Sequence, residues 1–325
     1  MKITQNLKWH LRVTILPQCN LRCIYCNPTG VFQKAILLDD EEILSIVKAA
    51  VACGITRVHW TGGEPCIRDV VSLFRKSRDL GIIQQIMTTN GSLRLDEIRA
   101  MKEAGLDRVN ISLDSLDYKR NKEITGKDYF KTTIKWIKTS CETFDLATKM
   151  NVVSMSSNLK EIPDFIKFAQ KFDGKLLLKF IELCPNNPAF YGDEIWRYLV
   201  SKQDIINELS IVGMLRLSNG LGDNPNAEYY LVGNTGVKVI LITMLSYNFK
   251  CGLASCRKMR ISPYGLVGSC IQQKGINLKG VLFEEKVEII RKKMETRESY
   301  SDISPVSRQH MQEDYGIWRF GELTK

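Results

Sequence analysis

The feature that most constrains the fold is a regular alternation of short apolar runs with amphipathic stretches between about residues 10 and 210. Each run is short enough for one strand, and the stretches between them carry apolar residues at helical spacing. This alternation is typical of repeated βα units, whose strands form a parallel sheet. We predict six such units, with strands at 11–16, 57–60, 85–88, 108–113, 149–153 and 175–181.

Six units are too few for a complete eight-stranded barrel, so the expected fold class is α/β, an incompletely closed TIM-like (β/α)6 barrel. Helices are expected at 40–53, 95–104, 130–143 and 159–172. After about residue 211 the pattern changes to paired strands at 229–232 and 237–243, strand pieces at 259–261 and 266–267, and a helix over 282–294. We therefore predict a partial barrel over 1–210 and a smaller C-terminal domain over 211–325.

Composition excludes several other classes of protein. The chain has no apolar run of the roughly 18 residues that a membrane span needs and no leader with a cleavage site, so neither a span nor a signal peptide is expected. It has ten cysteines. Without a secretory signal, that number indicates a reducing compartment in which thiols bind metals rather than form disulfides. We expect a cytoplasmic protein.

Three cysteines follow the first predicted strand within one loop, at Cys19, Cys23 and Cys26, with C-x3-C-x2-C spacing. Three thiols so close together cannot all form unstrained disulfides, whereas thiolates do converge on zinc, copper(I) or iron–sulfur clusters. A zinc site usually takes a fourth protein ligand. A four-iron cluster held by three cysteines leaves one iron open for another molecule. A structural zinc knuckle remains the alternative.

The C-terminal part has a second set of three cysteines, Cys251, Cys256 and Cys270, which would again leave one iron of a four-iron cluster open. A three-thiolate zinc site with one further ligand is again the alternative. The chain has only three histidines, and His10 and His310 offer no paired spacing for a Cys/His zinc site. Two iron–sulfur clusters therefore fit the cysteine count better.

Further informative residues follow the predicted strand ends. Gly62 and Gly63 leave room for a ligand to approach closely, and Glu64 can accept a hydrogen bond from a cation. Residues 88–90, Ser112 and Glu182 occupy equivalent places after other strands. In parallel α/β folds this edge of the sheet is where ligands bind.

The formal net charge of +10 favours an anionic partner. No Lys/Arg block or basic stripe interleaved with aromatics stands out, so a small phosphate ligand is expected rather than nucleic acid. Basic residues near strand ends form a plausible phosphate-binding set; they are Arg12, Arg57, Lys149, Lys179, Lys258 and Arg260. Taken singly, each also fits a solvated surface charge, and His59 fits a satisfied buried histidine.

The cysteine loop, with Tyr25 before its last cysteine, resembles the signature of the radical S-adenosylmethionine (SAM) enzymes. A longer series of matches in order resembles the GTP 3′,8-cyclase (MoaA) family within that superfamily. The matching stretches are 11–12, the cysteine loop, 61–65, 88–91, 104–117, 124–126, 149–153, 180–182 and the second cysteine set with its thirteen-residue gap.

The resemblance implies that Cys19, Cys23 and Cys26 hold a four-iron cluster whose open iron binds SAM. The implied SAM contacts are Tyr25, Gly62, Gly63, Glu64, Ser112 and Cys184. An auxiliary four-iron cluster on Cys251, Cys256 and Cys270 would meet the guanine. The implied substrate contacts are Arg12, Arg57, His59, Thr88, Lys149, Lys179, Lys258 and Arg260.

The implied activity is the first step of molybdopterin biosynthesis. SAM would be cleaved to a 5′-deoxyadenosyl radical that takes the ribose 3′ hydrogen of GTP, and C3′ would then bond to C8 of the guanine. The cofactors carry the radical chemistry, and the protein supplies orientation, charge and exclusion of water. The implied partners are a flavodoxin- or ferredoxin-type electron donor and a downstream pyranopterin synthase. A homodimer and a monomer are both open.

The departures from the family pattern fall in the substrate half. Four residues, not two, separate Cys251 from Cys256; His59, Lys179 and Lys258 stand for family arginines, and Cys184 for a methionine. The sequence ends Gly321-Glu322-Leu323-Thr324-Lys325, without the family's Gly-Gly tail. One alternative is a paralogue acting on another nucleotide, a nucleoside or a small precursor peptide. Another is a non-catalytic, metal-stabilised binding protein, which would carry zinc.

Overall fold

The computed structural model describes residues 9–26, 36–183, 193–213, 215–217, 227–243, 257–268 and 275–296. Four cysteines singled out in the sequence, Cys184, Cys251, Cys256 and Cys270, lie outside these ranges. The expectations for them remain predictions.

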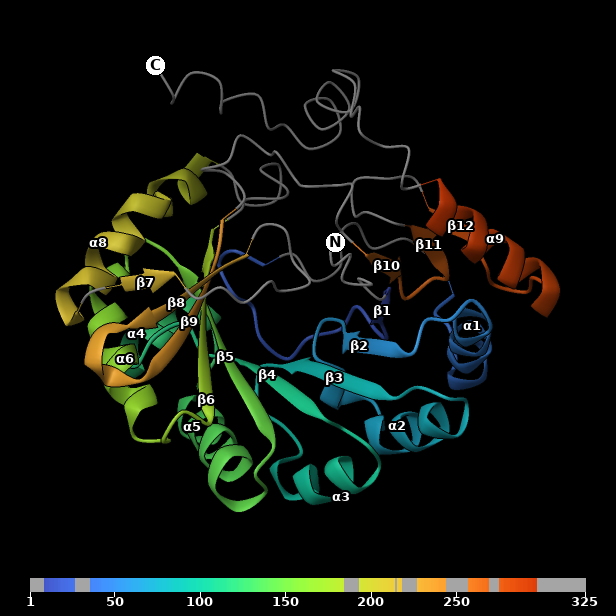
Figure 1. Cartoon of the computed structure of the whole chain (residues 1–325), viewed down its shortest axis with the longest axis horizontal. Helices are drawn as coiled ribbons and strands as arrows, with labels where there is room; N and C mark the ends of the chain where they lie inside the picture. Colours follow the sequence, from blue (N-terminus) through green and yellow to red (C-terminus); the bar gives the residue numbers. More distant parts are fainter. Residues whose placement is uncertain are drawn as a thin grey trace, which may run out of the picture.

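Six parallel strands in chain order form the centre of one curved, open sheet, with helices on its convex face (Figure 1). They are β1 (His10–Thr14), β2 (Arg57–Thr61), β3 (Gln84–Thr89), β4 (Arg108–Ser112), β5 (Ala147–Ser154) and β6 (Leu176–Glu182). Each strand pairs with the next in parallel register. The predicted partial barrel is confirmed.

The helices are α1 (Asp40–Ala52), α2 (Val70–Asp79), α3 (Ile98–Glu103), α4 (Tyr118–Thr125), α5 (Phe130–Lys138), α6 (Ile162–Gln170), α8 (Lys202–Val212) and α9 (Phe283–Glu295). α1 begins at a capping box made by Asp39 and Glu42. Several α-helices are shorter than predicted, because one end of the predicted range forms a turn of different pitch. In the helix predicted at 159–172, for example, residues 159–161 form a 3₁₀ turn that precedes α6. α2, α4 and α8 were not predicted.

The strands after residue 211 extend this sheet at both edges. On one side β9 (Val237–Ile242) runs parallel to β6, followed by β8 (Ala227–Val232) and β7 (Leu215–Leu217). On the other side β10 (Lys258–Ile261) runs parallel to β1, followed by β11 (Leu266–Gly268) and β12 (Ile276–Asn277). The strands predicted at 229–232, 237–243, 259–261 and 266–267 are confirmed, and the structure shows that each of the two pairs is antiparallel. The domain boundary at residue 211 remains a prediction.

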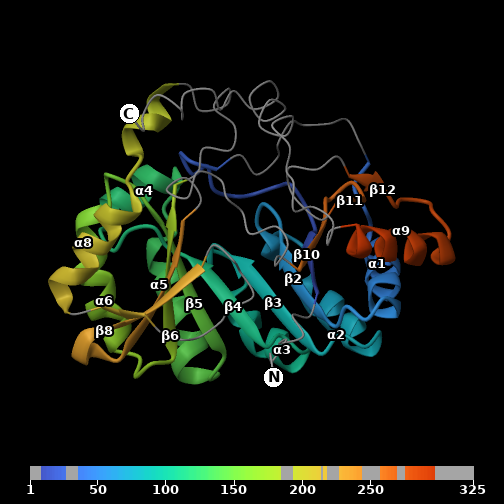
Figure 2. The ribbon, with the colours of Figure 1, turned by 45° about the horizontal axis from the view of Figure 1, so that its top comes forward.

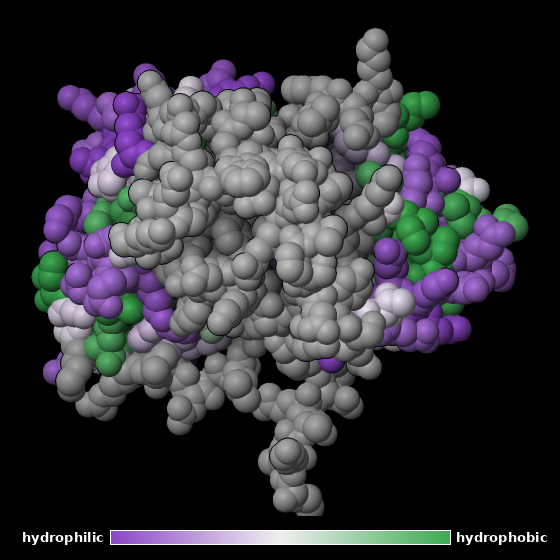
Figure 3. All heavy atoms as spheres, turned by 90° about the horizontal axis from the view of Figure 1, so that it is seen from above, coloured by the Kyte–Doolittle hydropathy of each residue, from purple (hydrophilic) through white to green (hydrophobic). Residues whose placement is uncertain are grey.

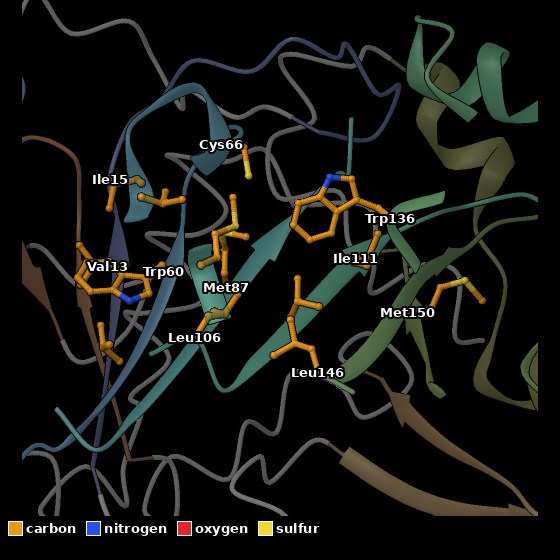
Figure 4. Close-up of a cluster of buried hydrophobic side chains, with 14 of the residues drawn as sticks. Val13, Ile15, Trp60, Cys66, Met87, Leu106, Ile111, Trp136, Leu146 and Met150 are labelled. Carbon is orange, nitrogen blue, oxygen red and sulfur yellow. The ribbon is translucent and has the colours of Figure 1, made fainter. Parts of the chain in front are cut away.

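Alternate strand residues divide the sheet into two faces. Val13, Trp60, Met87, Ile111 and Met150 point toward the helices and form the main hydrophobic core (Figure 4). The intervening residues face the concave side of the sheet, which Figure 2 brings toward the viewer. From above, the described atoms on both flanks are mainly hydrophilic, with smaller apolar groups among them (Figure 3).

Phe180 on β6 tests this core. Its side chain is fully buried, and its ring meets that of Phe165 on α6 edge to face, with centroids 6.0 Å apart. Phe180→Ala should lower the free energy of unfolding by about 3–5 kcal/mol, because it leaves a cavity. Denaturant titration measures this loss. Ile211→Ala on the exposed side of α8 is the control, with a change within about 0.5 kcal/mol.

Candidate functional site

The cysteine loop lies at the carboxyl end of β1 and is anchored to the end of α4. The Arg22 amide donates to the carbonyl of Thr125 and the Ile24 amide to that of Ile124, both at 2.9 Å. Ile24 and Tyr25 also pack against a small apolar cluster, separate from the main core, formed by Ile124, Met155, Leu183 and Ile195. The loop is therefore held by backbone hydrogen bonds and by an apolar platform.

The three cysteines of this loop are free thiols in one shared electrostatic environment. Burial, together with the negative charges of Cys19 and Asp114, raises the pKa of Cys26 to about 11. The pKa of Cys23 is raised well above its usual value by burial and by the charges of Asp114, Cys26 and Cys19. Without a positive centre these thiols stay protonated at neutral pH, which argues against a nucleophilic thiolate. Metal binding would deprotonate them.

The donor set fits an iron–sulfur cluster better than one metal ion. Among the described residues, no three Cys, His, Asp or Glu side chains are gathered for a single ion. The thiolates around a four-iron cluster stand further apart than the ligands of one ion. The amide of Leu21 and Nδ2 of Asn90 already donate to Sγ of Cys19, at 3.4 and 3.8 Å. Such hydrogen bonds help to set the properties of cluster sulfurs.

Gly62 and Gly63 let the loop after β2 pack directly onto the start of the cysteine loop. The Gly63 amide donates to the carbonyl of Leu16 at 2.9 Å, and the Glu64 amide to that of Gln18 at 2.8 Å. A Cβ atom on Gly63 would lie 2.0 Å from the Gln18 carbonyl oxygen, and one on Gly62 2.5 Å from that of Leu16. Only glycine permits this approach.

Glu64 has a different position from the one expected. We predicted a ligand-facing carboxylate, but the side chain is fully buried. Its oxygens accept from Oγ1 of Thr89 at 2.6 Å, the Asn90 amide at 2.7 Å and the Cys66 amide at 2.9 Å. Burial raises the pKa of Glu64, and these donors oppose that shift. In this structure Glu64 connects the loops after β2 and β3.

Replacing Gly63 should disturb the cysteine loop specifically. In Gly63→Ala the new methyl group clashes with the Gln18 backbone, so the loop must move and iron loading should fall severalfold. Iron and sulfide analysis after anaerobic reconstitution measures the loss. Gly174→Ala is the control: a Cβ there meets nothing within 4 Å, so its cost is the local strain of the left-handed φ of 78°, and iron loading should stay full. Full iron loading of Gly63→Ala would contradict this role.

The predicted basic residues line the inside of the barrel, not its mouth. Arg12 is the middle residue of β1, and its register partners are His59 on β2 and Arg260 on β10. Lys179 is the middle residue of β6, several strands away. The predicted strands at 11–16 and 175–181 already contained Arg12 and Lys179, and the expectation that these residues lie at strand ends was wrong because both sit in the middle of their strands. Together these basic side chains form a cationic cluster on the concave face of the sheet, below the cysteine loop, which we call the cationic chamber.

Charges in the chamber act on one another across the barrel. Burial lowers the pKa of Lys179 to about 7, helped by the positive charges of Arg12, Lys149, Lys258 and Arg108. Burial and the charge of Arg260 lower the pKa of Arg12 to about 9. Since β1 and β6 are not neighbours, the effect of Arg12 on Lys179 shows that both face the same space. An anion bound there would relieve this repulsion.

Two of the predicted residues, His59 and Thr88, belong to a hydrogen-bonded cluster of polar side chains in the chamber. Nε2 of His59 is 2.7 Å from Oγ1 of Thr88, and Nδ2 of Asn110 donates to the same Oγ1 at 3.2 Å. Burial lowers the pKa of His59 well below its usual value, and the charge of Arg12 lowers it further. The imidazole is therefore neutral at pH 7. Thr88, unlike Thr89, faces the chamber.

Sequence reasoning missed several chamber residues. The positive charges of His10 and Arg108 help to lower the pKa of His59. The Oδ1 atoms of Asn110 and Asn151 are buried without a hydrogen-bond partner in the described structure. Strand alternation could have indicated them, because His10 lies on the same face of its strand as Arg12, and Arg108 on the same face as Asn110. Such unsatisfied acceptors suit hydrogen-bond donors of a ligand.

The other predicted residues lie at different depths. Ser112 ends β4, on the side of the cysteine loop. Arg57 begins β2, at the opposite end of the barrel, where its Nε donates to Oε1 of Gln84 at 2.7 Å. Lys149 and Lys258 contribute to the charge around Lys179.

Comparison with known proteins relates this site to one family. The profile of the Radical SAM superfamily matches residues 13–169. The GTP 3′,8-cyclase of Petrotoga mobilis is 36% identical over 81% of this chain and 80% of that protein. The GTP 3′,8-cyclase of Clostridium perfringens is 33% identical over 87% of this chain and 88% of that protein.

The chain belongs to the GTP 3′,8-cyclase family. It is accordingly a radical SAM enzyme whose cofactors are four-iron clusters and SAM. Solved structures agree with this fold. Native anSMEcpe with bound AdoMet superposes with a TM-score of 0.62 at 14% identity, over 97% of this chain and 98% of that one. Streptococcus suis SuiB bound to S-adenosylmethionine gives 0.60 at 17% identity, over 87% and 68%.

In this member of the GTP 3′,8-cyclase family the cysteine loop lies beyond the carboxyl end of β1, whereas Arg12 and Lys179 lie in the middle of β1 and β6. Among the helices in the described ranges, none has both the length and the apolar content that crossing a bilayer requires.

Proposed function

We propose that this enzyme converts GTP to (8S)-3′,8-cyclo-7,8-dihydroguanosine 5′-triphosphate, the first step of molybdopterin biosynthesis. The cationic chamber directly below a three-cysteine loop is the observation that carries the proposal. The negative charge of a triphosphate would offset the repulsion among the basic side chains of the chamber. The sequence relationship to GTP 3′,8-cyclases supports the same substrate.

The cysteine loop is the proposed SAM site. Cys19, Cys23 and Cys26 would hold the cluster, and Tyr25, Gly62, Gly63, Ser112 and Cys184 would line SAM. When bound, the cluster and SAM supply an electron and the 5′-deoxyadenosyl radical that removes the ribose 3′ hydrogen. The Glu64 amide ties the glycine loop to the start of the cysteine loop at Gln18, and the Glu64 carboxylate ties it to Thr89 and Asn90 at the end of β3.

The chamber is the proposed nucleotide site. Arg12 and Arg260 present guanidinium groups that can grip phosphate in two places, whereas Lys179 offers a point charge. Lys149, Lys258, His59 and Thr88 would complete the contacts, and Arg57 lies farther away, at the start of β2. Cys251, Cys256 and Cys270 would hold the auxiliary cluster that meets the guanine.

The partners follow from the chemistry. Reductive cleavage of SAM needs a low-potential donor, so we assign a flavodoxin- or ferredoxin-type protein, and a pyranopterin synthase would take the later product. We place the enzyme in the cytoplasm, as a monomer or a homodimer, with neither a membrane nor nucleic acid as partner.

Binding of GTP should be accompanied by proton uptake at Lys179. At pH 8 a lysine with a pKa of about 7 is mostly neutral, and a bound triphosphate raises that pKa again. Uptake should therefore approach about one proton per site at pH 8. Calorimetry of GTP binding in two buffers of different ionisation enthalpy measures it.

Lys179→Met should abolish this uptake and weaken binding. Lys131→Met, on the exposed face of α5, is the matched control and should behave as the unmodified chain does. Undiminished uptake in Lys179→Met would show that another group titrates.

Turnover by the reconstituted enzyme tests the function itself. Anaerobically loaded protein with SAM, a low-potential reductant and GTP should release 5′-deoxyadenosine well above the level without GTP. Because one electron and one proton replace the abstracted hydrogen, the product is an isomer of GTP, and chromatography with mass analysis should find it as a new peak of the same mass. Cys23→Ala should lose both products. A precursor peptide or another nucleotide in place of GTP tests the paralogue alternative, and zinc in place of iron at the N-terminal loop would overturn the proposal.

A further inference from the structure

We infer that Asp114 is a positioning residue for the N-terminal cluster: it anchors the cysteine loop through Tyr25 and brings a negative charge, with no cation paired to it in the described part of the chain, close to Cys23 and Cys26. This inference rests on the proposed function in one respect, that the loop binds an iron–sulfur cluster. Asp114 follows β4 at the carboxyl end of the barrel. It would touch neither SAM nor GTP.

The carboxylate of Asp114 joins three segments of the chain. It is 2% exposed. Its Oδ2 accepts from the phenol of Tyr25 at 2.6 Å, and its Oδ1 accepts from the Val153 amide at 2.8 Å. The end of β4, the cysteine loop and β5 therefore meet at one side chain.

The surroundings of Asp114 keep it rigid. Nδ2 of Asn158 donates to the Asp114 carbonyl at 2.6 Å and to the Val153 carbonyl at 2.8 Å. Oδ1 of Asn158 accepts from the Met155 amide at 2.8 Å. The Tyr25 ring packs on the apolar platform described above, so the loop cannot shift without breaking both kinds of contact.

The charge of Asp114 acts on the cysteines. Among the described residues, its side-chain hydrogen-bond partners are a phenol and an amide, which are neutral groups that soften the charge but do not cancel it. The phenol belongs to Tyr25, which stands between Cys23 and Cys26 in the loop, so this hydrogen bond places the carboxylate on the side of the two thiols. A nearby negative charge opposes the addition of an electron, so it lowers the reduction potential of a cluster held there. Cleavage of SAM needs such a strongly reducing cluster.

Two variants separate the charge of Asp114 from its anchoring role. Asp114→Asn removes the charge at nearly constant shape, and Tyr25→Phe removes the anchor but leaves the charge. Both are made in the full chain, reconstituted anaerobically and titrated at pH 8 by electron paramagnetic resonance. The signal that changes on addition of SAM identifies the N-terminal cluster. Iron content and thermal unfolding are measured in parallel.

Asp114→Asn should shift the midpoint potential to a more positive value. Tyr25→Phe should leave it unchanged or move it more negative, because the carboxylate loses the phenol that disperses its charge. Asp128→Asn is the matched control: Asp128 accepts from Tyr118 in the same kind of pair on the surface. Its potential should equal that of the unmodified enzyme.

An unchanged potential in Asp114→Asn, or a positive shift in both variants, would overturn the inference and leave Asp114 a purely structural anchor. If Asp114→Asn does not retain iron, the midpoint potential of Tyr25→Phe is the deciding measurement. A positive shift of that potential contradicts the proposed charge effect, and no positive shift supports it. An unmodified chain that binds iron and turns over GTP, with no difference among the variants, defeats this inference alone. An unmodified chain that binds no iron defeats the proposed function.

Discussion

The buried carboxylate of Glu64 is the constraint on which the upper end of the barrel depends. It gathers donors from its own loop and from the loop after β3, while its backbone amide binds the start of the cysteine loop. A carboxylate is stable away from water only when protein donors replace its hydration. The loops after β1, β2 and β3 are therefore fixed to one another before any cofactor binds.

Below these loops the barrel has the opposite electrostatic character. Near Cys23 and Cys26 the charge of a neighbouring side chain is negative, from Asp114, whereas the basic residues around Lys179 bring several positive charges together. Repulsion among buried like charges opposes folding, and it is tolerated because alternate residues on the other face of every strand pack a continuous apolar core. The polarity of the site follows from strand alternation, with Trp60 outward and His59 inward.

The sequence was sufficient for the barrel and for the cysteine loop because both depend on local signals. Strand and helix periods are readable within a short window, and a C-x3-C-x2-C spacing fixes three donors on one loop. The long-range contacts were not readable. Nothing near Glu64 indicates that Thr89 and Asn90 will enclose its carboxylate, and nothing near Asp114 indicates that it will meet Tyr25, 89 residues earlier. The pairing of β9 with β6 and of β10 with β1 depends on the same kind of distant contact.

The crowding of bases in the chamber has a practical consequence for handling the protein. A cluster of like charges gains stability from any small polyanion that binds it, whether nucleotide, pyrophosphate or buffer phosphate. We therefore expect protein purified from cells or stored in phosphate to retain such anions. Binding constants measured on that material would report the exchange of one anion for another.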